Sequence, residues 1–303
     1  MAHLPEPQAM RAGPHAALEP MPLVVGVIGT GRAGATLARS FDRAGHEVVI
    51  ARRGASANRL AADLGAPVRG RAEVLATADV TFLAVPDSAI AGLAAELAPN
   101  AVPGNGRVVA HLSGSQGRSV LDPLAARGYA TAAIHPLQVL SGWRIAPGTA
   151  FAVEAEPGAA VVAGRLVADL AGVEVTLPAG SRAAYHAAAV MAANLGMTML
   201  AEAVDLLEKQ GIPRGEALEG LGSLVRGGLE ASMDRGLPGA LTGPVTRGDA
   251  ATVAAHLDAL AGDPDLRRAY AAGSLLTLRQ GVRDGRPEDS QAVIIRRLLE
   301  DAL

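Results

Sequence analysis

Near its start the chain reads Leu23-Val24-Val25-Gly26-Val27-Ile28-Gly29-Thr30-Gly31-Arg32-Ala33-Gly34. An apolar run ends there in a cluster of glycines. A helical pattern follows as far as Gly45, and a second apolar run covers residues 47–51. This order predicts a strand, a tight turn, a helix and a second strand.

The glycines of this stretch have the spacing G-x-G-x-x-G. Gly29 permits the turn, Gly31 lets a pyrophosphate approach the backbone, and Gly34 lets the helix pack closely on the strand. The free N–H groups and positive dipole end of the helix then face the phosphate. The turn therefore predicts a dinucleotide site, with an ordinary strand-to-helix turn as the alternative. The candidate cofactor residues of this turn are Gly29, Thr30, Gly31, Arg32, Ala33 and Gly34.

The residues after the second strand bear on the choice of cofactor. An acid near this point holds the ribose of NAD, whereas arginine accommodates the 2′-phosphate of NADP. Residues 48–62 contain no acid, and they include Arg52, Arg53 and Ser56. We therefore expect NADP, and the alternative is that both arginines are solvated loop charges.

Length, composition and charge exclude several classes of protein. The 303 residues suffice for two domains, and half of them are hydrophobic. With 27 basic and 30 acidic residues the net charge is −3, which argues against a general nucleic-acid binder. The absence of cysteine excludes disulfides and thiolate nucleophiles and fits the cytoplasm. Residues 1–20 are rich in proline and read as a disordered leader that lacks the pattern of a signal peptide.

Further apolar runs predict more strands, at residues 80–85, 107–112, 129–134, 151–155 and 173–177. Helical patterns alternate with most of them, so we expect a doubly wound, mostly parallel sheet over residues 21–178. Ligands bind beyond the carboxyl ends of such strands. Candidate cofactor contacts at these ends are Val85, Pro86 and Ser113. His111 and His135 also lie at strand ends, either as functional groups or as structural ones.

Residues 179–303 show helical patterns and no strand pattern, which predicts an all-helical domain. Ser181 can cap a long helix over residues 182–210. Further helices are expected around 214–235, 249–261, 263–284 and 288–302, with a break at residues 236–239. Residues 183–201 carry no formal charge, and we interpret them as a buried helix rather than a membrane span.

The motifs together resemble Rossmann-like oxidoreductases that carry a C-terminal DUF2520 helical domain. The resemblance rests on the glycine turn and on the stretches 111–115, 135–138, 185–194 and 241–249, the last of which reads Leu-Thr-Gly-Pro-Val-Thr-Arg-Gly-Asp. It covers about residues 22–285 and implies an NADP-dependent oxidoreductase. The implied domain architecture is similar to that of β-hydroxyacid dehydrogenases, ketopantoate reductases and deazaflavin-dependent NADP reductases.

One departure from these relatives concerns the catalytic acid. β-Hydroxyacid dehydrogenases place a catalytic lysine four residues before an asparagine, and the matching positions here hold Val190 and Asn194. Lys209, the only lysine, is about four helical turns beyond Asn194 and cannot take the place of a lysine at position 190. The lysine mechanism is therefore not carried over.

Reduction of a carbonyl needs another proton donor, and histidine titrates in the right range. His186 precedes Val190 by one helical turn, which makes it the first candidate, with His135 as its rival and Asn194 as a group that orients the substrate. Each has a structural alternative, namely a packed histidine or a hydrogen-bonded amide.

In the second domain Thr242 and Arg247 are candidate substrate contacts, because an arginine can hold a carboxylate by a bidentate pair. Asp249 is a good helix cap. No cluster has the spacing of metal ligands, and no G-x-S-x-G elbow of a serine hydrolase is present.

These residues favour an NADP-dependent reductase of a small carbonyl or imine acid bound between the two domains. A deazaflavin-type or iminium reductase, and a non-catalytic NADP sensor, stay open as alternatives. The sequence does not name the substrate. The apolar start of the helical domain further predicts a homodimer formed by residues 180–303.

Overall fold

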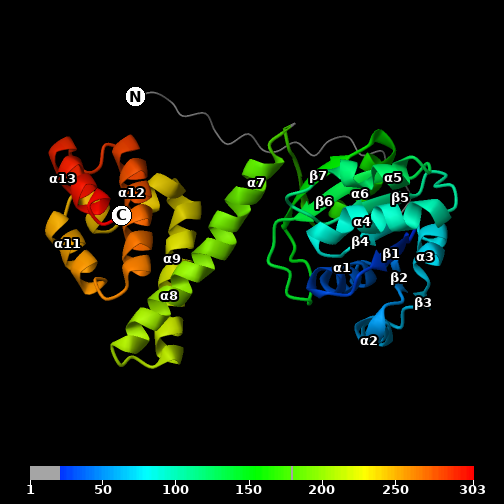
Figure 1. The fold of residues 1–303 in the computed structure, drawn as a ribbon, viewed down its shortest axis with the longest axis horizontal. Helices are drawn as coiled ribbons and strands as arrows, with labels where there is room; N and C mark the ends of the chain where they lie inside the picture. Colours follow the sequence, from blue (N-terminus) through cyan, green and yellow to red (C-terminus); the bar gives the residue numbers. More distant parts are fainter. Residues whose placement is uncertain (1–20, 179) are drawn as a thin grey trace. The chain divides into compact units, whose positions relative to one another are not determined.

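The computed structural model describes residues 21–178 and 180–303 (Figure 1). The predicted leader, residues 1–20, lies outside the described residues. The chain divides into two compact units that part between Ala193 and Asn194.

The first unit is built on one eight-stranded sheet with the order β3-β2-β1-β4-β5-β6-β7-β8. All neighbours pair in parallel except β6 and β7. The order 3-2-1-4-5-6 is that of a doubly wound dinucleotide-binding sheet, so the predicted fold class is confirmed. The strands are β1 Val24–Ile28, β2 Glu47–Ala51, β3 Val68–Arg69, β4 Val80–Leu83, β5 Val108–His111, β6 Ala130–Pro136, β7 Ala150–Ala155 and β8 Val173–Thr176.

Two features of the sheet differ from expectation. The strand β3 contains only two residues, too few for an apolar pattern to reveal. The strand β7 runs antiparallel, because residues 137–149 connect it to β6 without the helix that a parallel crossover requires.

Helices cover both faces of the sheet, as a doubly wound fold requires. One buried cluster joins the sheet to α1, α2 and α6, and a second joins it to α3, α4 and α5. The sequence pattern did not indicate the short helix α3. The helices are α1 Arg32–Arg43, α2 Gly54–Leu64, α3 Arg71–Thr77, α4 Asp87–Leu97, α5 Asp122–Ala125 and α6 Pro157–Asp169.

The predicted long helix is continuous but not uniform. It consists of α7 Arg182–Ala189, a π-helical segment Val190–Leu195 and α8 Gly196–Lys209. Ser181 occupies the N-cap position, yet its hydroxyl donates to the Pro178 carbonyl at 2.7 Å and caps no N–H group.

The expectation that this helix is buried is wrong. Val204 is its one buried residue, and residues 182–209 are long and apolar enough to cross a membrane by length and composition alone. The sequence pattern shows that a face is apolar, but it does not show what covers that face.

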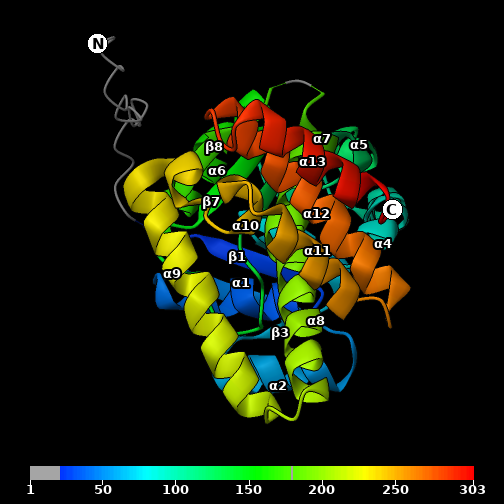
Figure 2. The same cartoon turned by 90° about the vertical axis from the view of Figure 1, so that its left-hand side faces the viewer.

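The second unit confirms the four helices predicted after residue 213. They are α9 Arg214–Ala240, α11 Ala250–Ala259, α12 Pro264–Arg283 and α13 Asp289–Glu300, and the short helix α10 Pro244–Arg247 is an addition to them. The helices α8 and α9 run side by side (Figure 2). The predicted break in α9 occurs at Gly236, where φ is 77°. Asp249 caps α11 by accepting a hydrogen bond from the Thr252 N–H, as expected.

Candidate active site

The glycine turn between β1 and α1 has the geometry that its spacing predicts. Gly29 has a φ of 111°, and a Cβ on Gly34 would lie 1.9 Å from the Gly29 carbonyl oxygen. A Cβ on Gly31 would meet nothing within 4 Å, and this residue is exposed. Two glycines therefore shape the turn, and the third leaves space above the backbone that a phosphate can occupy.

A second group of cofactor candidates lies where β2 leads into α2. The Thr30 and Ser56 hydroxyls lie 2.9 Å apart and link the two turns. Arg52 and Arg53 are exposed, and neither forms an ion pair with any described residue. Because α2 starts at Gly54, directly after these arginines, its free N–H groups add to their attraction for a phosphate.

The loop after β5, residues 112–117, is held in place by His111. This histidine is fully buried, its Nδ1 accepts from the Ser113 N–H at 3.2 Å, and its Nε2 lies 3.1 Å from the Gly117 carbonyl oxygen. Burial lowers the pKa of His111, so the ring is neutral with its proton on Nε2. His111 is therefore a structural group that fixes the loop.

The same loop is held a second time by α4. The Ser113 and Ser115 hydroxyls donate to Asp87 Oδ2 at 2.6 and 2.8 Å. Ser113 is buried, so its hydroxyl, a predicted cofactor contact, serves here to position the loop. Val85 and Pro86 lie between β4 and α4, the first half-buried and the second exposed.

Two histidines and a tyrosine meet beside this loop. His135, near the end of β6, lies with its Nδ1 2.8 Å from the Tyr185 hydroxyl oxygen. The rings of His135 and His186 are 6.1 Å apart between centroids, at 78°. Gly114 faces both, since a Cβ on it would lie 2.5 Å from His186 Nδ1 and 2.9 Å from His135 Nε2.

Helix α7 is held against this loop by Arg182. The Arg182 Nη2 pairs with Glu154 Oε2 at 2.9 Å, and its Nη1 donates to the Ser113 carbonyl at 3.3 Å. Arg182, Tyr185 and His186 have the spacing i, i+3, i+4, which puts them on one side of the helix. The sequence showed this spacing, but it did not show which strand the side faces.

The charge of His135 follows from its surroundings. Burial, the neighbouring His186 and the Arg182 guanidinium lower the pKa of His135 to about 4. His135 is therefore neutral at pH 7, and it donates a proton only if another group replaces that proton.

Three of the predicted site residues lie in the second unit. Asn194, Thr242 and Arg247 are exposed, and their side chains make no hydrogen bond or ion pair with described residues. The premise that Asn194 is buried is therefore wrong. Lys209 pairs with Asp263 at 3.8 Å near the end of α8, far along the helix from Val190.

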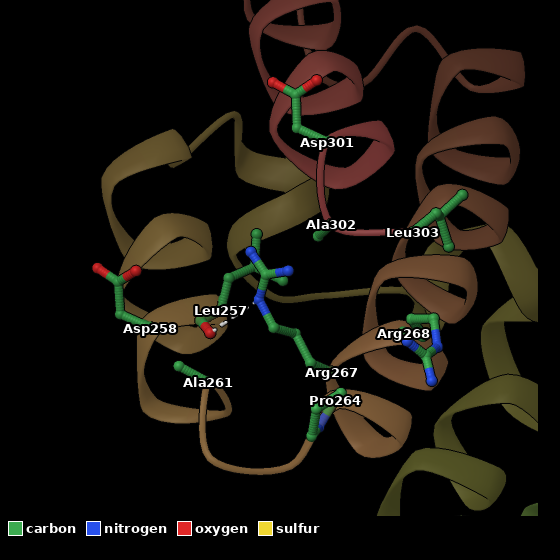
Figure 3. Close-up of a pocket in the computed structure, with 9 residues that line it drawn as sticks. All are labelled: Leu257, Asp258, Ala261, Pro264, Arg267, Arg268, Asp301, Ala302 and Leu303. Carbon is green, nitrogen blue, oxygen red and sulfur yellow. Dashed lines mark hydrogen bonds between the residues drawn. The ribbon is translucent and has the colours of Figure 1, made fainter.

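A cavity of about 350 Å³ lies in the second unit between α11, α12 and α13 (Figure 3). Arg267 reaches across it and donates from Nε to the Leu257 carbonyl at 3.3 Å. None of the residues predicted to bind or react lines it. The cavity therefore supports no step of the chemistry considered above.

Comparison with known families identifies both parts of the chain. A Rossmann-like domain matches residues 10–136, and a domain of unknown function, DUF2520, matches residues 149–277. A search among curated proteins finds no match.

Several solved structures share the fold. A candidate NADP oxidoreductase from Bacteroides fragilis has a TM-score of 0.71 and 23% identity, over 85% of this chain and 98% of its own. A reductive aminase from Aspergillus terreus, in complex with NADPH and ethyl levulinate, has a TM-score of 0.60 and 19% identity. The match covers 91% of this chain and 99% of the aminase. A 1-pyrroline-5-carboxylate reductase from Streptococcus pyogenes has a TM-score of 0.57 and 16% identity. The match covers 92% of this chain and 98% of the reductase. At these identities the similarity shows the fold alone.

The glycine geometry predicts that folding and binding can be separated at two neighbouring positions. Gly31→Ala is expected to leave the melting temperature unchanged, because its Cβ meets open space, but to weaken NADPH binding at least about tenfold by obstructing a phosphate. Gly34→Ala is expected to destabilise the first unit itself, because its Cβ meets a backbone oxygen. Thermal unfolding and NADPH titration of both variants check this, and equal losses of stability would contradict it.

Proposed function

Since this chain belongs to the proteins that join a Rossmann-like domain to a DUF2520 domain, we propose that it is an NADP-dependent oxidoreductase. Its substrate is a small carbonyl or imine acid. The observation that carries the proposal is the glycine turn, where open space above Gly31 and an exposed arginine pair at the start of α2 suit a dinucleotide with a 2′-phosphate.

The proposed chemistry needs a hydride and a proton. NADPH, when bound, supplies the hydride from its nicotinamide ring. His186 and His135 supply or relay the proton, because both present ring nitrogens at Gly114 beyond the carboxyl ends of the strands. A reductive aminase in complex with NADPH and a 1-pyrroline-5-carboxylate reductase share this fold, which supports the reaction class proposed for this chain.

Two other functions compete with this one. A deazaflavin-type or iminium reductase would use the same cofactor site without a protein acid, because an iminium is already cationic. A non-catalytic NADP sensor would bind NADPH without consuming it. NADPH consumption on a panel of pyruvate, glyoxylate, levulinate, 1-pyrroline-2-carboxylate, 1-pyrroline-5-carboxylate and a deazaflavin separates the enzymes from the sensor. We further expect a cytoplasmic location.

The arginine pair predicts the cofactor preference. NADPH is expected to bind more tightly than NADH, and the double change Arg52→Ala and Arg53→Ala should remove most of this preference while NADH affinity changes little. The matched control changes Arg279 and Arg283, two exposed arginines of α12 without ion pairs among described residues. Equal affinities for NADPH and NADH in the unmutated protein would refute the preference.

The histidines predict the effect on turnover. His186→Ala is expected to lower turnover of a carbonyl substrate about 10²- to 10⁴-fold, whether His186 donates the proton itself or holds the substrate oxygen beside the donor, with NADPH affinity unchanged. Steady-state kinetics on the active member of the panel measure this, and His135→Ala is tested beside it. If only His135→Ala loses turnover, His135 is the acid. If neither variant does, the iminium or deazaflavin alternative gains.

We also infer that the chain forms a homodimer through its helical region. Exposed apolar side chains of α9 recur on one side of the helix, at Leu218, Val225, Leu229 and Met233. Such a stripe normally meets a partner. The apolar helix of residues 182–209 adds further exposed methionines.

A dimer is expected in light scattering at micromolar concentration. Leu229→Glu should give a monomer, whereas Ser223→Glu, which adds the same charge to the same helix at an exposed polar position, should not. A monomeric unmutated protein contradicts the dimer. Sedimentation of the protein with lipid vesicles would assign the apolar surface to a membrane instead.

A further inference from the structure

The ring nitrogens of His135 and His186 are close enough to share one ligand atom. A Cβ built on Gly114 would lie 2.9 Å from His135 Nε2 and 2.5 Å from His186 Nδ1, so the two nitrogens are separated by at most the sum of these distances, 5.4 Å. One oxygen atom with two hydrogen bonds of about 2.8 Å spans such a gap. A side chain at position 114 would fill the same space.

Neither nitrogen has a hydrogen-bond partner in the part of the chain that the structure describes. The His186 Nδ1 is buried there without one, and the His135 Nε2 makes none. A buried polar atom without a partner is rare, and it indicates a ligand or a water molecule.

The Tyr185 hydroxyl determines which nitrogen of His135 carries the proton. His135 Nδ1 is the one hydrogen-bond partner of this hydroxyl among described residues. A neutral imidazole has one donor and one acceptor nitrogen. Because the phenol has no other acceptor there, it donates to Nδ1 and leaves the His135 proton on Nε2, directed at Gly114.

We propose that His135 Nε2 and His186 Nδ1 together bind the carbonyl oxygen of the substrate, and that Tyr185 is the positioning residue that fixes the tautomer of His135. This inference rests on the proposed function and narrows its substrate class to carbonyl compounds. A carbonyl oxygen has two lone pairs and accepts two hydrogen bonds. The nitrogen of an iminium has no lone pair and accepts no hydrogen bond.

The proton step balances through this chain of groups. Hydride addition forms a C–H bond at the carbonyl carbon, breaks the C=O π bond and leaves the electron pair on oxygen. That oxygen takes the Nε2 proton of His135, while the Tyr185 proton moves to Nδ1 and a solvent proton returns to the phenol. The relay lets a neutral histidine act as the donor although its pKa is about 4.

The charged and titratable groups around His135 are few. His186 and Arg182 face it from α7, His111 from β5 and Asp87 from α4. Arg182 and His186 disfavour a positive charge on the ring, and Asp87 favours it. Neutral His135 is therefore expected across the pH range of a turnover measurement.

The chain contains a matched control for the hydrogen bond. In the second unit His256 Nδ1 lies 2.8 Å from the Tyr270 hydroxyl oxygen, with ring centroids 5.7 Å apart, close to the 5.6 Å of His135 and Tyr185. Tyr270→Phe therefore removes the same hydrogen bond away from the candidate site, together with the interaction of this hydroxyl with Ser274.

The first readout is the tautomer of His135, which ¹⁵N NMR spectra of protein with ¹⁵N-labelled histidine show at pH 7. The variants His135→Gln and His186→Gln assign the signals of these two histidines. The Nε2–H form is expected in the unmutated protein and in Tyr270→Phe, and a mixture of both tautomers in Tyr185→Phe. Adding pyruvate with NADP⁺ should shift the His135 Nε2 and His186 Nδ1 signals together.

The second readout is turnover of pyruvate and glyoxylate. Tyr185→Phe is expected to lower kcat about tenfold or more, with the KM for NADPH unchanged, and Tyr270→Phe should stay within about twofold of the unmutated protein. Gly114→Ala, whose Cβ occupies the gap, should abolish both the pyruvate-induced shifts and turnover while the circular dichroism spectrum stays native.

The outcomes separate this inference from the proposed function. An Nδ1–H tautomer in the unmutated protein, or full turnover in Tyr185→Phe, overturns the inference and leaves the reductase standing. The expected tautomer and shifts without NADPH consumption refute the reductase and leave the oxygen site. If the protein reduces the pyrroline carboxylates and none of the carbonyl compounds, the inference that its substrates are carbonyl compounds is wrong.

Discussion

The candidate site depends on the alignment of four parallel strands. Ile28 of β1 pairs with Leu83 of β4, Leu83 with His111 of β5, and His111 with Ala133 of β6. The strands β1, β4 and β5 end at this row and β6 continues to Pro136, so the glycine turn, the Pro86 turn, the Ser113 loop and His135 all lie along one edge. Backbone pairing thus brings together residues that are more than a hundred positions apart.

The edge is then made rigid by groups that do no chemistry themselves. His111 and Asp87 hold the loop after β5, and Arg182 holds α7 against it. Gly114 can then approach both candidate histidines because it carries no side chain. A neutral His111 and a neutral His135 in one small volume also avoid the repulsion that two imidazolium ions would cause.

Local sequence signals predicted most of the fold. The glycine spacing, the long apolar runs and the caps identified seven of the eight strands and the helical second domain. The strand β3 has two residues, which is too short for a periodic signal, and the antiparallel direction of β7 depends on a connection without a helix. The exposure of residues 182–209 depends on what covers them, which no local pattern contains.

The arrangement of the candidate site could be predicted only in part, for the same reason. His135 and His186 were candidates because each lies in a stretch that a motif singles out, and the structure brings their rings together. The roles of Tyr185 and Gly114 depend on contacts across fifty and seventy residues, and these are visible only in three dimensions. His111 also lies at a strand end in the sequence, as His135 does. Its side chain is nevertheless structural, because it is fully buried in the core.

A crystal structure with NADP⁺ bound tests the central claim most directly, because it locates both ends of the dinucleotide. The account predicts the pyrophosphate above Gly31, the 2′-phosphate at Arg52 and Arg53, and the nicotinamide ring beside His135. A dinucleotide whose nicotinamide ring lies away from the Gly114 loop, or whose 2′-phosphate avoids both arginines, would contradict the account.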